Sequence, residues 1–160
     1  MKSFLTYGLV VLLLGFSSCR SREGRESLSA ESLYNMGRYA SLAEDWTGAV
    51  DYFQQSVTAA LASGDCYYEG YSRLQLAVLW ASEEEYSRAL YYALSATECL
   101  DACGEFVGAS FSRLSIAWQY VSMGEDDMAR ALVDTVHAAF PSPDSPMAYY
   151  IDHLYSIIGN

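Results

Sequence analysis

The sequence predicts an all-α fold in which helical hairpins stack on one another along the chain. The first observation is a repeat with a step of forty residues, since Y-S-R-L-Q-L-A-V-L-W at 71–80 returns as F-S-R-L-S-I-A-W-Q-Y at 111–120. The second is a series of alanines with the same step, Ala49, Ala89 and Ala129. The third is a small residue twelve positions before each of them, Gly37, Ala77 and Ala117. Because antiparallel helices pack most closely where a side chain is small, this spacing predicts two helices in every unit.

Composition leaves room for one domain with its own core and disfavours nucleic acid as a partner. The chain has 160 residues, of which 52% are hydrophobic. From Ser29 onward five arginines stand against eighteen Asp and Glu, a balance of −13. Such a surface repels phosphate backbones, so we expect no direct binding of nucleic acid. The acidity is most simply a solvated surface.

The first nineteen residues form a hydrophobic segment that ends at a cysteine. Lys2 supplies a positive charge, and the apolar run from Phe4 to Phe16 is too short to span a bilayer. The F-S-S-C motif at 16–19 resembles the lipobox of bacterial lipoproteins, although Phe16 replaces the usual leucine. The resemblance implies a signal peptide at 1–18 and acyl chains such as palmitate on Cys19 as a membrane anchor. An ordinary secretory signal cut elsewhere is the alternative.

Residues 19–28 are charged, short and aperiodic, which is typical of a flexible linker. Arg20, rather than aspartate, follows Cys19. By resemblance to lipoproteins of Gram-negative cells, this favours the outer membrane, facing the periplasm, over the inner membrane.

Capping residues and hydrophobic stripes predict the first three helices. Ser29 can cap a helix that runs to about Leu42. Asp45 can cap the second helix, whose apolar residues recur at helical spacing until Ser63-Gly64-Asp65. The third helix, at about 66–81, is apolar on more than one face, which fits a helix packed between neighbours.

Four more helices follow. Ser82-x-x-Glu85 is a capping box for the fourth helix, and Gly104 ends it. The fifth helix ends near Met123-Gly124, a suitable C-cap, and the sixth stops before Pro141. Ser145-Pro146 opens the last helix, with proline at the first helical position.

These units resemble tetratricopeptide repeats of the longer, forty-residue spacing. The two small-residue series described above match the family's small positions, and the aromatic residue before the second series matches Trp46 and Tyr86, whereas the third unit has Asp126. The late proline matches only Pro141, and the family's aromatic at the fourth position is replaced by Leu33, Arg73 and Arg113. The resemblance implies a right-handed α-solenoid with repeats at about 30–65, 66–104 and 105–141, within 29–141. Residues 142–160 would form a C-terminal capping helix.

In the resembled family the first helices of successive repeats line a concave groove that binds peptides. Its groove-facing positions carry over to Tyr34, Arg38, Tyr71, Leu74, Val78, Phe111, Leu114 and Trp118. These residues become more apolar and aromatic along the stack, which suits an apolar peptide or an amphipathic helix. The lysines and asparagines with which some members grip C-terminal carboxylates are absent from these positions. The alternative is that the last helix or a second subunit, as in a homodimer, covers the groove.

Arg73 and Arg113 stand one repeat apart and would project in parallel. They could hold an acidic ligand together, or the protein's own carboxylates could neutralise them. The acidity of the domain favours the second alternative.

Three cysteines remain after the lipidated one. The close approach of Ala77 and Ala89 sets the register of their hairpin and places Cys66 beside residue 100, next to Cys99. In an export compartment this spacing predicts a Cys66–Cys99 disulfide, with Cys103 one turn further on. Three small buried thiols are the alternative.

No catalytic, phosphate-binding or metal-ligating pattern is evident, and the two histidines, at 137 and 153, lie on separate predicted helices. We therefore expect no enzyme activity, cofactor or metal. The preferred function is a non-catalytic, lipid-anchored module of the bacterial cell envelope that binds an unidentified protein or peptide. The alternative is a periplasmic sensory segment of a larger, truncated signalling or transcriptional regulator.

Overall fold

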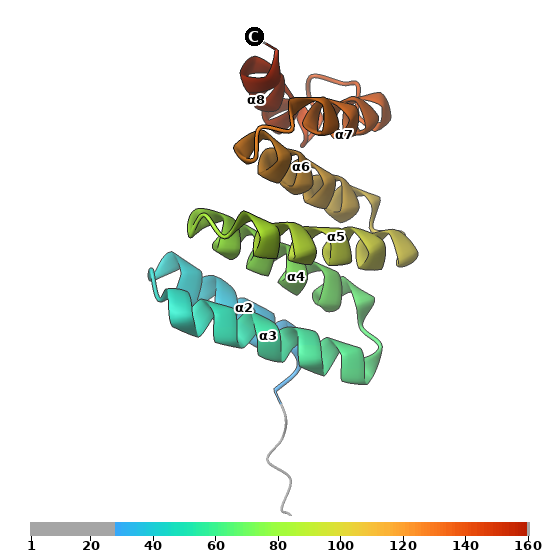
Figure 1. Cartoon of the computed structure of the whole chain (residues 1–160). Coiled ribbons are helices and arrows are strands. Elements are labelled where there is room, and N and C mark those ends of the chain that lie inside the picture. The colour runs from blue at the N-terminus through green and yellow to red at the C-terminus, as the bar shows by residue number, and fades with distance from the viewer. Residues whose placement is uncertain (1–27, 160) are drawn as a thin grey trace, which may run out of the picture.

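Residues 28–159 are described by a computed structural model, and they form an all-α, repeat-like structure (Figure 1). Its helices are α2 (Ala30–Leu42), α3 (Trp46–Ser63), α4 (Cys66–Ser82), α5 (Tyr86–Ala102), α6 (Phe106–Ser122), α7 (Asp126–Ala139) and α8 (Ala148–Ile158). The predicted signal peptide, its lipidated Cys19 and nearly all of the linker lie outside the described residues. The all-α fold is confirmed.

Side-chain caps begin the helices of the first half of the chain. The Ser29 hydroxyl accepts a hydrogen bond from the Ser32 N–H, and Asp45 accepts one from the Gly48 N–H. Asp65 does the same for Tyr68 at the start of α4. Each cap satisfies a backbone donor that has no partner within the helix.

The predicted capping box at Ser82-x-x-Glu85 does not form. Helix α4 continues through Ser82, whose hydroxyl donates to the Leu79 carbonyl oxygen instead. Glu85 is the N-cap of α5 and makes no side-chain capping bond. The box fails because Ser82 still has helical backbone and therefore cannot turn its hydroxyl toward the next helix.

The last helix also starts later than the sequence indicates. Pro146 lies in a turn closed by a hydrogen bond from the Ala148 N–H to the Ser145 oxygen, and α8 begins at Ala148. Met147, directly before it, is fully buried. The turn brings Met147 into the core before the helix begins.

Consecutive helices pack against each other, and α2, α4, α6 and α8 also contact one another in that order (Figure 1). The alanines of both forty-residue series are fully buried, and a Cβ at Gly37 would lie 2.7 Å from the Phe53 ring. The buried apolar residues form four clusters, one joining α2, α3 and α4, two joining α4, α5 and α6, and one joining α6, α7 and α8. Each cluster joins neighbouring helices, so the core is distributed along the chain.

Buried serines link successive helices of the chain. Ser72 of α4 donates to the Ser56 hydroxyl of α3, which donates to the Ala30 carbonyl oxygen of α2. Forty residues after Ser72, Ser112 of α6 donates to the Ala93 carbonyl oxygen of α5. Ser72 and Ser112 are both fully buried, and each hydroxyl has the hydrogen-bond partner that a buried polar group needs.

Candidate peptide-binding groove

Helices α4, α6 and α8 line an open cavity of about 660 Å³, with Tyr34 of α2 at one end. Seven of the eight residues predicted for a groove line it: Tyr34, Tyr71, Leu74, Val78, Phe111, Leu114 and Trp118. The predicted Arg38 is not among its lining residues. Val78 and Trp118 occupy the equivalent positions of the next two units, forty and eighty residues beyond Arg38, and both line the cavity. The cavity therefore ends before the C-terminal half of α2.

Helix α8 supplies one wall of this cavity, whereas the sequence predicted this helix only as a cap or as an alternative cover of the groove. Its lining residues are Tyr149, Tyr150, His153 and Leu154. The rings of Phe111 and Tyr150 meet edge to face at 5.5 Å between centroids, and the Trp118 and His153 rings stack at 5.6 Å. A signal was present in the sequence, because Leu154 continues the forty-residue step of Leu74 and Leu114.

The cavity remains open beside α8. Val78 is 51% exposed and Trp118 is 40% exposed. Helix α8 stacks His153 on Trp118 yet leaves Trp118 and Val78 exposed, so the last helix covers the predicted groove only in part. Leu74 and Leu114, which also line the cavity, are buried, with exposed fractions of 8% and 4%.

The cavity is uncharged within a strongly acidic protein. Its lining, drawn from the described residues, includes no Asp, Glu, Lys or Arg. Burial raises the pKa of Tyr34 and of Tyr71, so both phenols are neutral hydrogen-bond donors at neutral pH. Gln119, also in the lining, is 1% exposed, and its Oε1 has no hydrogen-bond partner among the described residues. A buried acceptor of this kind is favourably placed only when a donor reaches it.

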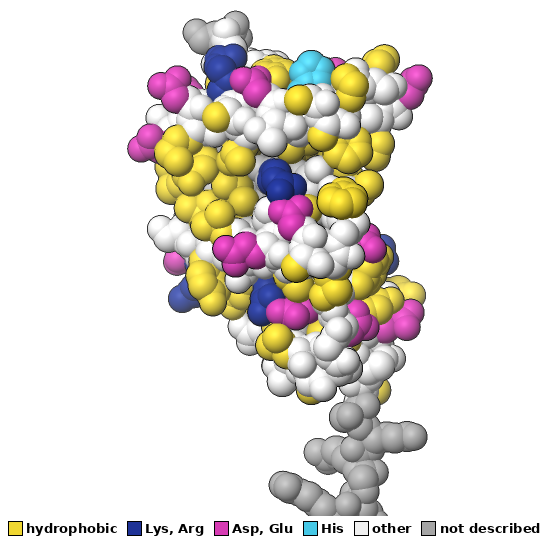
Figure 2. Space-filling view, turned by 90° about the vertical axis from the view of Figure 1, so that its right-hand side faces the viewer, with side chains coloured by type: hydrophobic (Ala, Val, Ile, Leu, Met, Phe, Trp, Pro, Cys, Tyr) yellow, Lys and Arg dark blue, Asp and Glu magenta, His cyan; other side chains and the backbone are white. Residues whose placement is uncertain are grey.

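The two arginines considered for an anionic ligand already contact carboxylates of the protein. Arg73 pairs with Glu69 on the same helix, and Arg113 of α6 pairs with Asp101 of α5. Figure 2 shows dark blue basic side chains directly beside magenta acidic ones on one face, with yellow hydrophobic patches between them. These contacts agree with neutralisation by the protein's own carboxylates, and the two arginines form no free cationic pair.

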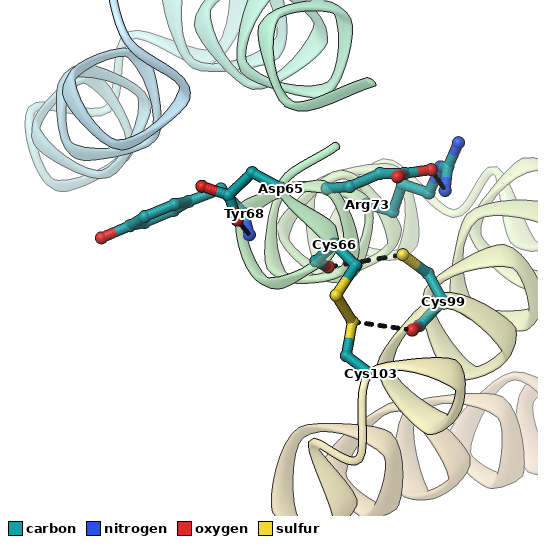
Figure 3. The surroundings of a disulfide bond; sticks show 7 residues. Asp65, Cys66, Tyr68, Arg73, Cys99 and Cys103 are labelled. Carbon is teal, nitrogen blue, oxygen red and sulfur yellow. Dashed lines mark hydrogen bonds and ion pairs between the residues drawn. A yellow bond between two sulfur atoms is a disulfide. The ribbon is translucent and has the colours of Figure 1, made fainter. Parts of the chain in front are cut away.

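The cysteine pairing differs from the predicted one. The disulfide joins Cys66 to Cys103, with 6.2 Å between their Cα atoms, and Cys99 is a free thiol (Figure 3). Cys99 does lie beside Cys66, because its Sγ is 3.4 Å from the Cys66 carbonyl oxygen. However, Cys103 follows the last residue of α5, where the chain turns toward α6 and brings its sulfur to the start of α4. Burial raises the pKa of the Cys99 thiol, which is therefore protonated at neutral pH.

Residues 28–159 contain no group of three or more His, Cys, Asp or Glu side chains that could hold a metal ion. In the same part of the chain, no helix is both long enough and apolar enough to cross a membrane. No family model matches the chain, and no curated protein or solved structure matches it either.

Proposed function

We propose that this protein is a non-catalytic, lipid-anchored binding module of the bacterial cell envelope. Its fold would be a right-handed α-solenoid of three tetratricopeptide-like hairpins with α8 as a capping helix. The groove on α4, α6 and α8 would bind the apolar face of a helical peptide. The observation that carries this proposal is that three series of positions with the forty-residue step line an open cavity whose lining has no Asp, Glu, Lys or Arg.

The size and chemistry of the cavity support a peptide as the occupant. Its volume of about 660 Å³ lies within the range of ligand-binding clefts. Exposed Val78 and Trp118 provide apolar contact area, and aromatic anchors in a pocket dominate the energy of many interfaces. Tyr34 and Tyr71 add phenolic hydroxyls that can hydrogen-bond to a ligand and orient it.

The test of the groove uses a designed helical peptide with Leu at i, i+3, i+4 and i+7 and Gln elsewhere. Its affinity is measured by fluorescence anisotropy for the wild type and for Val78→Asp, in full chains that carry Cys19→Ser to prevent lipidation. We expect Val78→Asp to weaken binding at least tenfold, because it places a charge in the apolar contact.

Leu94→Asp is the matched control. Leu94 is 46% exposed, close to the 51% of Val78, but it does not line the cavity. We expect it to leave the affinity unchanged. Equal losses of affinity in both variants would contradict the proposal. So would a wild type that does not bind the designed peptide more tightly than a scrambled peptide of the same composition.

The anchor is proposed from the sequence, because Lys2, the apolar run and the F-S-S-C motif precede a charged spacer. Expression of the unchanged chain in Gram-negative cells with an alkyne-labelled palmitate should label the protein and recover it with outer membranes. Cys19→Ser should abolish the label and release the protein from membranes. Labelling that persists in this variant would place the lipid elsewhere or refute the anchor.

A further inference from the structure

We infer that the helix bound by the groove is cationic along one flank, with its Lys or Arg side chains facing a row of carboxylates on the hairpin tips. This inference rests on the proposed function and specifies the chemistry of its partner. Its basis is an acidic edge of the molecule beside a groove whose lining has no Asp, Glu, Lys or Arg.

Three hairpin tips lie along one edge of the structure, on the left in Figure 1. They are the connections from α2 to α3, α4 to α5 and α6 to α7. Together with the first turn of α7 they carry eight exposed carboxylates, which we call the acidic edge: Glu44, Asp45, Glu83, Glu84, Glu85, Glu125, Asp126 and Asp127.

Few of these carboxylates make a capping bond or an ion pair within residues 28–159. Asp45 caps α3 through the Gly48 N–H, whereas Glu85 and Glu125 are N-caps without a side-chain capping bond. Neither of the two ion pairs among residues 28–159 involves the acidic edge. The edge therefore presents a concentrated negative potential that a cationic partner would neutralise.

Two residues of the acidic edge have a backbone conformation that disfavours a side chain. Glu44 and Glu84 have φ of 59° and 60°, the left-handed region that disfavours residues with a side chain. The equivalent position of the third tip holds Gly124, with φ of 78°. Two of the three tips therefore have a carboxylate where glycine would be more stable.

The groove runs to this edge. Ala81 and Ser82 line the cavity and directly precede Glu83 in the chain. An apolar helix face in contact with Val78 and Trp118 would thus have its flank close to the tip of the second hairpin. In the lining of the groove, the buried Gln119 oxygen has no hydrogen-bond partner among the described residues, and as an acceptor it offers nothing to an anion. Charge and hydrogen-bonding capacity both favour a partner that brings donors and positive charge.

The experiment compares three helical peptides that share one apolar face and differ only in the flank, which is Lys, Gln or Glu. Affinities for the full chain carrying Cys19→Ser are measured by fluorescence anisotropy at 20 mM and 200 mM NaCl. We expect the order Lys, Gln, Glu, with about tenfold between the first and last at low salt and less at high salt.

The double variant Glu83→Gln/Glu84→Gln should weaken the Lys peptide about three- to fivefold and leave the Gln peptide unchanged. The control Glu98→Gln/Asp144→Asn removes the same charge from exposed positions away from the acidic edge and should leave both affinities unchanged. Circular dichroism verifies that both variants fold.

The two proposals fail in different ways. If the three peptides bind equally well, or if the control variant loses as much affinity as the edge variant, the inference about charge is wrong while the groove stands. If the Gln peptide does not bind the wild type, the proposed function itself is wrong. Sedimentation that shows a dimer dissociated by Val78→Asp would identify a second copy of the chain as the occupant and overturn the inference.

Discussion

At the scale of single residues, Tyr155 shows how a contact at the end of the chain couples stability to pH. Its hydroxyl donates a 2.6 Å hydrogen bond to the Asp134 carboxylate, which ties α8 to α7. Burial, and then the adjacent carboxylate, raise the pKa of Tyr155 from 10.0 to about 12. The folded protein thus keeps this proton where the unfolded chain loses it, so the stabilisation is complete below pH 10 and is lost as the pH rises toward 12.

Tyr155→Phe should lower the free energy of unfolding by about 1 kcal/mol at pH 7, the usual contribution of one hydrogen bond. Above pH 10 the difference from the wild type should shrink, because the wild type then loses the same contribution. Urea unfolding at pH 7, 10 and 11 measures both effects. Tyr149→Phe, at a residue 73% exposed, is the control and should change neither. Parallel curves for wild type and Tyr155→Phe across this range would contradict the coupling.

A second prediction at this scale concerns the cysteines. In Cys103→Ser, we expect Cys99 to form the disulfide with Cys66, since its Sγ already lies 3.4 Å from the Cys66 carbonyl oxygen. Closing a loop of this length stabilises a protein by about 2–4 kcal/mol, so the variant should retain most of that stability in oxidising conditions. Non-reducing peptide mapping identifies the pair, and Cys99→Ser/Cys103→Ser shows the stability without any disulfide. Two free thiols in the oxidised Cys103→Ser variant would show that Cys99 cannot reach Cys66.

At the scale of elements, two of the connections between helices carry a glutamate at a position where glycine would be more stable. Glu84→Gly should stabilise the protein by about 0.5–1 kcal/mol, because glycine adopts a positive φ without the penalty of a side chain. Gly124→Ala should destabilise it by a similar amount for the opposite reason. Thermal unfolding measures both. A loss of stability in Glu84→Gly would mean that this glutamate makes a stabilising contact in the fold.

Helix existence and most helix ends follow from local sequence, and for that reason they could be predicted. Ser29 and Asp45 act through hydrogen bonds that span three residues, and the sequence displays them directly. The capping box at Ser82 failed because α4 extends one residue beyond its predicted end at about 81, so Ser82 keeps helical backbone. The disulfide partner of Cys66 was placed one helical turn too early, since the observed partner stands four residues after Cys99 and both cysteines lie beside Cys66. Local patterns place such features to within a residue or a turn, and the assembled structure decides between the neighbours.

The groove was predictable to the extent that it follows the repeat. Seven of its residues stand at positions fixed by the forty-residue step, while Arg38 shows that the step alone does not mark where the cavity ends. The wall formed by α8 was not predicted, because residues 142–160 were interpreted as a capping helix and not as part of the groove, although the forty-residue step reaches Leu154. Whether a cavity stays open depends on the side chains around its rim, and these are known only from the assembled structure.

At the scale of the whole molecule, charge and core are arranged differently. The buried clusters are distributed along the chain, whereas the charge is predominantly of one sign, with five arginines against eighteen carboxylates from Ser29 onward. Two of those arginines form ion pairs, Arg130 donates to the Ile158 carbonyl oxygen, and Arg88 lies over the Trp80 ring. Most carboxylates therefore repel one another without compensation, and this repulsion opposes folding.

Salt should consequently stabilise this protein. Raising NaCl from 20 to 200 mM shortens the screening length to less than 10 Å and weakens repulsion among the carboxylates more than it weakens the two ion pairs. We expect the Tm of the full chain carrying Cys19→Ser to rise by about 3 °C, and the rise should be smaller in Glu83→Gln/Glu84→Gln because fewer charges crowd the acidic edge. Sucrose, which stabilises without screening, should raise the Tm of both proteins equally. A Tm that falls with salt would mean that the ion pairs outweigh the repulsion, and the acidic edge would then lack the uncompensated potential that the inferred cationic partner requires.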